Sequence, residues 1–157
     1  MTLAVSAPLA GVVVALDDVP DAVFAEGVVG PGLAVLPDVR SGLTAVLAPV
    51  TGVLAAVHPH AFLLQVDARR SVLVHLGVDT VTLRGEGFTV HRVVGDRLTV
   101  GDPVVSWDVA QVAACGLSVV CPVVAVQAAA EQVAAQVAPG TRVDAGDPLL
   151  SWSSPGA

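Results

Sequence analysis

Two stretches of this chain repeat each other: Asp96-Arg-Leu-Thr-Val-Gly-Asp-Pro-Val-Val-Ser-Trp107 and, near the end, Thr141-Arg-Val-Asp-Ala-Gly-Asp-Pro-Leu-Leu-Ser-Trp152. A second, looser pair relates Ala7-Pro-Leu-Ala-Gly-Val-Val-Val-Ala-Leu16 to Ala48-Pro-Val-Thr-Gly-Val-Leu-Ala-Ala-Val57. In each copy a Gly-Asp-Pro or Pro-x-x-Gly turn leads into an apolar run. The repetition predicts a duplicated β-unit whose two copies pack face to face.

The composition indicates an all-β protein. Hydrophobic residues make up 54% of the 157 residues and charged residues 13%, so the chain can bury a substantial core, and we expect it to be folded rather than disordered. The apolar residues are mostly Val and Ala, and 15 Gly and 11 Pro interrupt them, which favours many short strands over long helices. We expect one domain over residues 1–157, with its core at about 5–152.

The strands and helices can be placed approximately. Strands are expected at Gly32–Leu36, Ala61–Val66, Ser71–Leu76, Thr89–Val94 and Ser118–Gln127. The clearest helical stretch is Ala128–Val137, which Pro139-Gly140 ends. A shorter helical turn is expected after Asp108, which can cap it, and the tail after Trp152 is expected to be frayed.

The charge pattern excludes several classes of function. The net charge is −7, and the seven basic residues are scattered arginines, so we expect no nucleic-acid partner. An acidic surface suits a basic protein partner instead. The absence of lysine excludes a lysine-tethered biotin or lipoyl group, a Schiff base and a lysine phosphate anchor.

The compartment is predicted to be the cytoplasm. The first residues lack the basic segment of a signal peptide and reach Asp17 early. Cys115 and Cys121 have no metal-ligand spacing, and we expect both to be reduced, buried thiols. The uncharged stretch Val109–Ala130 contains polar residues and Pro122, so it is interpreted as a turn plus a buried strand without membrane insertion.

The histidines carry the candidate chemistry. His58 and His60 lie on one face if their segment is extended, because side chains alternate along a strand. His75 joins them if a hairpin around 67–70 places its strand beside theirs. His91, next to Arg92, is predicted to lie on a solvent-facing strand.

One hypothesis for these histidines is a zinc site. His60 and His75, with Asp79 four residues further on, are ligand types that suit zinc. The His-x-His and His-x-x-x-Asp elements resemble those of lysostaphin-type zinc peptidases, but their order along the chain is reversed. A zinc hydrolase is therefore the less favoured alternative, and zinc bound between His60 and His75 without hydrolysis is a separate expectation.

The other hypothesis is a phosphoryl relay. A neutral imidazole is nucleophilic near pH 7, and its phosphoramidate is energetic enough to be passed onward. One ring nitrogen must then be exposed while a carbonyl or carboxylate holds the other, and Gly77 would let the backbone approach the ring of His75. A second imidazole can donate to the phosphoryl oxygens. This chemistry requires no cofactor.

Motifs spread over nearly the whole chain resemble one family. They are Ala7-Pro-Leu-Ala-Gly11, Asp18-Val-Pro-Asp21-Ala-Val-Phe24-Ala-Glu26, Val29-Gly-Pro-Gly32, Leu47-Ala-Pro-Val-Thr-Gly52, His60-Ala-Phe62, Val74-His75-Leu-Gly77-Val-Asp79-Thr80-Val81, Gly85-Glu-Gly-Phe88 and Val100-Gly-Asp102. In this order they resemble the glucose-type EIIA component of the bacterial phosphoenolpyruvate-dependent sugar phosphotransferase system.

The resemblance implies a fold and a function. The fold would be an antiparallel β-sandwich or barrel-like duplicated hybrid motif with one or two short helices. His75 would accept a phosphoryl group from the carrier HPr and pass it to a cysteine of an EIIB domain of a membrane sugar permease. His60 would support the phosphoryl group. A regulatory binding module, which signals sugar status to transporters or enzymes through its phosphorylation state, is the alternative.

The resemblance also implies supporting roles and one departure. Asp21 and Asp79 would meet an arginine of the carrier. The apolar rim on which both partners dock would consist of Phe24, Phe62, Leu73 and Leu76. Where the family usually has a threonine that supports the site by hydrogen bonding, this chain has His58, which would act as a substitute donor or increase metal affinity.

Overall fold

The structure, a computed structural model of the chain, describes residues 2–153, and most of the tail predicted to be frayed lies outside the described residues. Its strands are β1 (Thr2–Ser6), β2 (Gly11–Ala15), β3 (Gly32–Leu36), β4 (Leu43–Leu47), β5 (Gly52–His58), β6 (Ala61–Gln65), β7 (Ser71–His75), β8 (Phe88–Val90), β9 (Arg97–Leu98), β10 (Pro103–Asp108), β11 (Cys121–Ala125), β12 (Val133–Ala135), β13 (Arg142–Val143) and β14 (Pro148–Ser153). The helices are α1 (Ala22–Ala25) and α2 (Val109–Ala114), with 3₁₀ turns η1 (Leu16–Asp18), η2 (Thr80–Leu83) and η3 (Ala130–Gln132).

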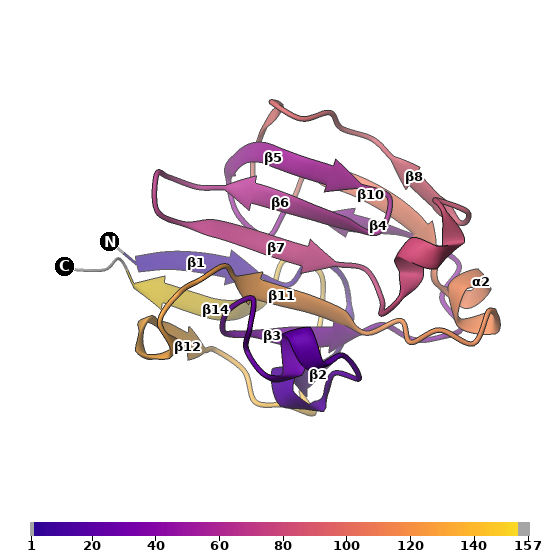
Figure 1. The fold of residues 1–157 in the computed structure, drawn as a ribbon, viewed down its shortest axis with the longest axis horizontal. Coiled ribbons are helices and arrows are strands. Elements are labelled where there is room, and N and C mark those ends of the chain that lie inside the picture. Colours follow the sequence, from indigo (N-terminus) through magenta and orange to yellow (C-terminus); the bar gives the residue numbers. More distant parts are fainter. Residues whose placement is uncertain (1, 154–157) are drawn as a thin grey trace.

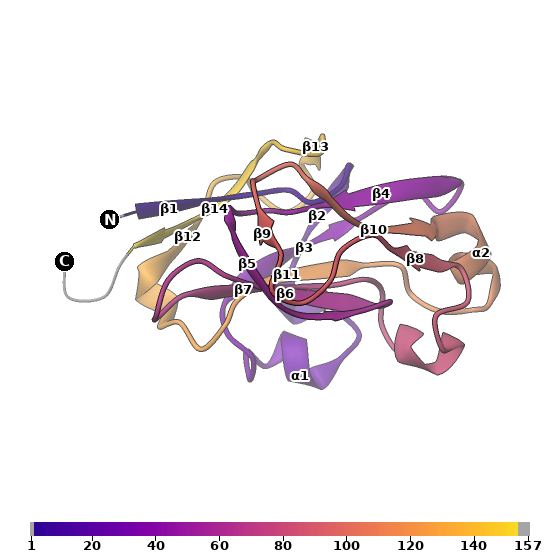
Figure 2. The ribbon, with the colours of Figure 1, turned by 90° about the horizontal axis from the view of Figure 1, so that it is seen from above.

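The strands form one large sheet faced by two small ones. The eight-stranded sheet has the order β13-β2-β3-β11-β7-β6-β5-β9, and the three-stranded sheets are β1-β14-β12 and β4-β10-β8. Figures 1 and 2 show β5, β6 and β7 in one layer and β1, β14 and β4 in the other. All described strand pairs are antiparallel, and the all-β prediction is confirmed.

The duplication is visible in matching backbone hydrogen bonds. Ala48 N–H donates to the carbonyl of Asp102 (2.8 Å), and the corresponding Ala7 N–H donates to Asp147 (2.8 Å). In both copies the glycine that precedes this aspartate donates its N–H back to the same alanine: Gly101 to the carbonyl of Ala48 and Gly146 to the carbonyl of Ala7, each at 2.9 Å. Each Gly-Asp-Pro turn is therefore bonded to its Ala-Pro turn in the same way, which supports the predicted duplication of a β-unit.

The core lies between the layers. Trp107 and Trp152, at corresponding positions of the repeats, are buried at its centre. A smaller apolar cluster covers the outer face of the large sheet under α1, where Phe24 packs near Val124 and Leu73. Figure 2 shows α1 on the side of β6 and β7 that faces away from β1 and β14. This outer cluster supports the side of the sheet on which His75 lies.

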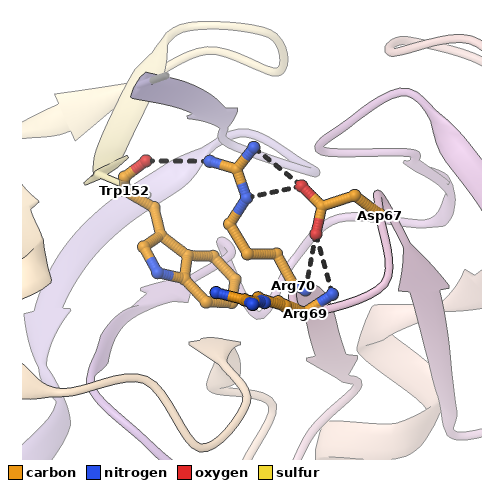
Figure 3. A network of polar contacts seen from close by, with 4 residues as sticks. All are labelled: Asp67, Arg69, Arg70 and Trp152. Atoms are coloured by element: carbon orange, nitrogen blue, oxygen red, sulfur yellow. Dashed lines mark hydrogen bonds and ion pairs between the residues drawn. The ribbon is translucent and has the colours of Figure 1, made fainter. Parts of the chain in front are cut away.

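An arginine network ties the β6–β7 hairpin to the last strand. Nε of Arg70 donates to Asp67 (2.8 Å), and Nη1 donates to the carbonyl oxygen of Trp152 (3.3 Å). The Asp67 carboxylate also accepts the backbone N–H groups of Arg69 and Arg70, both at 2.9 Å, as Figure 3 shows. The carboxylate thus shapes the turn, and the buried guanidinium joins it to β14.

The prediction of one helix was wrong. Ala128–Val137 was expected to be helical, but it forms only η3 and then β12, which pairs with β14. The alanines favour a helix locally, but pairing with β14 lets Val133 and Val137 pack against the core, and this tertiary packing overrides the propensity. The helical turn after Asp108 is confirmed as α2, whose Gln111 N–H is capped by that carboxylate (3.1 Å).

The other elements lie close to their predicted positions. β3 coincides with the predicted strand, and β6 and β7 each end one residue early. β8 and β11 are shorter than the predicted strands at 89–94 and 118–127. Within residues 2–153 there is no helix whose length and hydrophobicity suffice to cross a membrane.

Candidate functional site

Three neighbouring strands bring the histidines together. In the ladder, Ala61 of β6 pairs with His58 of β5 on one side and with His75 of β7 on the other. Directly opposed residues share a face, so these three side chains form one row across the sheet. His60 lies in the two-residue turn between β5 and β6 and not in a strand. The predicted hairpin at 67–70 joins β6 to β7 and places His75 in this row.

The ring of His75 is held by a backbone carbonyl. Its Nδ1 lies 2.6 Å from the carbonyl oxygen of Gly77. A carbonyl only accepts, so Nδ1 carries the proton and Nε2 is left with a free electron pair. This is the arrangement that the phosphoryl-relay hypothesis requires of an acceptor histidine.

The glycine at position 77 is required by its surroundings. Its φ is +77°, and a Cβ there would lie 2.7 Å from the carbonyl oxygen of Ser118 and 2.6 Å from Cγ2 of Thr80. The buried Thr80 hydroxyl donates to the carbonyl of Leu76 (2.6 Å), and Val78 N–H donates to Ser118 (3.0 Å). These bonds fix the backbone that presents the Gly77 carbonyl.

The three imidazole rings form a continuous row of contacts, with His60 between His58 and His75. The rings of His60 and His75 are 5.3 Å apart between centroids and nearly perpendicular, at 66°. His58 stacks on His60, with centroids 5.6 Å apart and planes inclined by 26°. Phe24, from α1, meets His75 edge-on at 5.3 Å. The structure therefore brings all three predicted histidines and one predicted aromatic side chain together.

Burial keeps the central rings neutral. It lowers the pKa of His75, while the hydrogen bond to Gly77 and the charges of Asp21 and Asp79 oppose this shift. Burial also lowers the pKa of His60, and the neighbouring rings of His75 and His58 lower it further. A neutral His75 is nucleophilic and a neutral His60 still has one N–H to donate.

The two predicted carboxylates flank the site. Asp21 caps α1 by accepting the N–H of Val23 (2.9 Å). Asp79 is exposed, has a left-handed backbone conformation and opens η2. Both act electrostatically on His75. Their roles toward a partner stay predictions.

The predicted apolar rim is only partly exposed. Phe62 and Leu76 are fully buried, and Phe24 is nearly so, while Leu73 is half-buried. Phe62 pairs with Val74, so it lies on the core face, opposite to His75. Phe62 and Leu76 therefore cannot form an exposed rim, and this part of the prediction was wrong.

Exposed valines, which the sequence analysis did not single out, lie beside the site elements. Val23 in α1 and Val28 after it are 48% and 62% exposed, and Val81 in η2 is 57% exposed. A cavity of about 290 Å³ lies beside α1 and is lined in part by Phe24, Glu26 and Gly30. Valine is common throughout this chain, so the only sequence signal was that Val23 and Val81 each follow Asp21 or Asp79 by two residues, and Val28 had none.

Two histidines are the candidate metal ligands. Among residues 2–153 no group of three or more His, Cys, Asp or Glu side chains is placed to hold a metal ion. His60 and His75 would supply two ligands, so zinc binding stays a prediction from the sequence. His91 lies outside the cluster and bonds Ser106 through Nε2 (2.7 Å).

Both cysteines are free thiols. Cys121 is buried, as predicted, but Cys115 is exposed, so the prediction that both thiols are buried was wrong for Cys115. Burial raises the pKa of the Cys121 thiol to about 12. That thiol is therefore unreactive at neutral pH.

Comparisons with known proteins match this chain to one family. Residues 3–131 match the family described as phosphoenolpyruvate-dependent sugar phosphotransferase system, EIIA 1. The glucose-specific EIIA component of Halalkalibacterium halodurans is 42% identical over 120 residues, which are 75% of this chain and 67% of the relative. That of Oceanobacillus iheyensis is 38% identical over 124 residues, 78% of this chain and 73% of the relative.

Fused relatives and a solved structure complete the comparison. The beta-glucoside-specific EIIBCA component of Bacillus subtilis is 38% identical over 122 residues, 76% of this chain but 19% of the relative, so this chain spans about a fifth of its length. The structure of glucose permease IIA from Mycoplasma capricolum has a TM-score of 0.84 and 31% identity over 96% of both chains.

Proposed function

The chain belongs to the EIIA 1 family of the phosphoenolpyruvate-dependent sugar phosphotransferase system, and on this premise we propose that it is a cytoplasmic phosphocarrier whose acceptor is Nε2 of His75. The phosphoryl donor is the phosphohistidine of HPr. The acceptor of the second step is a cysteine of an EIIB domain in a sugar permease. No cofactor takes part in either step.

The observation that carries this proposal is the 2.6 Å contact between Nδ1 of His75 and the Gly77 carbonyl. It fixes the tautomer in which Nε2 has the electron pair. The lowered pKa of His75 keeps that pair unprotonated at neutral pH. Both features are properties of a nucleophile, and a structural histidine needs neither.

The first transfer follows from this geometry. The electron pair of Nε2 attacks the phosphorus of phospho-HPr, a new N–P bond forms, and the N–P bond of the carrier breaks. The leaving imidazole keeps the electron pair of the broken bond. The phosphorylated ring of His75 becomes cationic, and its Nδ1–H bond to the Gly77 carbonyl becomes stronger because the donor is now charged.

The second transfer reverses these roles. A cysteine thiolate of EIIB attacks the phosphorus, the N–P bond at His75 breaks, and Nε2 regains its electron pair. The ring of His60, 5.3 Å from that of His75, is near enough to donate to a phosphoryl oxygen as negative charge shifts onto it. His60 is thus the supporting group for onward transfer.

Partner surfaces surround the histidines. Asp21 and Asp79 give the site an acidic border that suits basic residues on HPr. The exposed valines Val23, Val28 and Val81 supply apolar area that both partners can cover in turn. An EIIB partner is further supported by relatives named as fused EIIBCA components.

The proposal is tested by reconstituting the relay. Incubation with labelled phosphoenolpyruvate, enzyme I and HPr should give an acid-labile phosphoprotein with about one phosphoryl group per chain. Adding an EIIB domain should remove the label. Failure of the wild-type chain to be labelled, with a known EIIA protein labelled in parallel, would refute the proposal.

A further inference from the structure

The ring of His60 lies between two other imidazoles. His58 and His75 share one row of the sheet but stand two strands apart, which separates them by roughly 10 Å. The small, buried Ala61 lies between them in this row. His60 comes from the turn, and its centroid lies 5.6 Å from that of His58 and 5.3 Å from that of His75. Its ring therefore occupies the space above Ala61.

The two central histidines are held in different ways. The ring of His75 is fixed by its bond to the Gly77 carbonyl. Within the described part of the chain, the ring nitrogens of His60 make no hydrogen bond, although its backbone carbonyl accepts from Leu76 N–H (2.7 Å). The backbone of His60 is thus anchored, but only contacts with the neighbouring rings restrict its side chain. Of these two contacts, the stacking contact is made by His58.

We propose that His58 is a positioning residue of the phosphoryl site, whose ring stacks on His60 and holds it in the orientation that meets a phosphoryl group on His75. The inference rests on the proposed function, because it assigns His58 a part in the onward transfer. His58 does not contact the reacting atoms, since His60 stands between it and His75.

Stacking is the property of His58 that this role needs. The turn backbone is already restricted, because Pro59 has a fixed φ and packs against Gly85, where an added Cβ would lie 3.3 Å from Cγ of Pro59. The remaining freedom is rotation of the His60 side chain, and a flat ring against one face limits it. Any aromatic ring at position 58 supplies that contact, whereas a small side chain does not.

The test compares His58→Ala and His58→Phe with the wild type in two steps. The first step is labelling by phospho-HPr, and the second is single-turnover transfer from the phosphorylated protein to a purified EIIB domain. His58→Ala should slow the second step about two- to tenfold at saturating EIIB and leave the concentration for half-saturation unchanged. His58→Phe should restore the rate to within about twofold of the wild type.

Two controls make the result specific. His91→Ala removes an exposed histidine outside the cluster and should leave both steps unchanged. In a His60→Ala background, His58→Ala should have no further effect on transfer, because the ring that it positions is gone. Thermal unfolding of each variant confirms that the fold is kept.

Three results would overturn the inference: a wild-type rate for His58→Ala, an equal loss in His58→Phe, or an undiminished effect of His58→Ala when His60 is absent. These are distinct from failure of the proposed function. If the wild type itself is not labelled by phospho-HPr, the relay is wrong. If it relays normally and the variants break this pattern, only the role of His58 is wrong.

Discussion

The carbonyl oxygen of Gly77 lies 2.6 Å from Nδ1 of His75, two residues earlier in the chain. In the proposed relay this contact directs the nucleophile, because it commits Nδ1 as the donor and leaves Nε2 of His75 with a free electron pair. It exists because the chain reverses at Gly77 with a positive φ. The supports from Thr80 and Ser118 hold this reversal in place.

Replacement of Gly77 by alanine should damage both stability and transfer. The added Cβ meets the Ser118 carbonyl and Thr80, and the positive φ is strained for alanine, so we expect a loss of about 2–3 kcal/mol in unfolding free energy. The rate of labelling should fall about tenfold or more as the carbonyl moves. Gly140→Ala is the matched control, since its φ is +92° and nothing lies near its Cβ position. Equal effects of the two changes would contradict this account.

The stability of the folded protein should depend on pH, because the pKa values of His60 and His75 are lowered. Because burial lowers the pKa of His75 and His60, the folded protein binds fewer protons than the unfolded chain between the folded pKa values and about 6.5. Their contribution to stability is thus complete above pH 6.5 and is lost as the pH falls toward the folded pKa values.

This dependence can be measured in two ways. Urea unfolding should show lower stability at pH 5.5 than at pH 7.5, and His75→Gln should reduce the difference. An NMR titration should place the midpoint of His75 below 6.5. A midpoint above that value would show that its charge partners, Asp21 and Asp79, outweigh burial.

Loss of His60 should separate the two transfers. His60→Ala leaves the His75–Gly77 contact intact, so labelling by phospho-HPr should still occur. Transfer to EIIB should slow about 10²-fold, because a donor to the phosphoryl oxygens is lost. Quench-flow measurement of each step gives the comparison. Unchanged onward transfer would remove His60 from the mechanism.

The arginine network should matter for stability and not for transfer. Arg70→Ala removes buried hydrogen bonds to Asp67 and to the Trp152 carbonyl, and should lower the unfolding free energy by about 1–3 kcal/mol. Arg40→Ala breaks an exposed pair with Asp38, in which the Arg40 side chain is 87% exposed, and should have no measurable effect. Equal unfolding free energies for the two variants would show that the Arg70 network does not join the hairpin to β14.

Much of the fold could be predicted from the sequence, because Gly and Pro residues mark the turns between strands. Gly101 and Gly146 both have positive φ and stand at the same place in the two repeats, so the repeated Gly-Asp-Pro marks repeated structure. The alanine-rich stretch 128–137 was mistaken for a helix because its pairing with β14 is a long-range contact that local propensity cannot reveal.

The site was predictable in its members but not in its arrangement. Alternation predicted that His58 and His60 share a face of an extended strand, yet the chain turns after His58, and His60 reaches the same side from the turn. The buried position of Phe62 follows from its register opposite Val74, which no motif encodes. The resemblance indicated which residues are the candidates, and the strand register shows how their side chains meet.

NMR of the phosphorylated protein, labelled with ¹⁵N-histidine, shows directly whether Nε2 of His75 accepts the phosphoryl group. We expect a phosphorus–nitrogen coupling to Nε2 of His75, with Nδ1 still protonated. A phosphoryl group on Nδ1 of His75, or on His60 or His58, would contradict it.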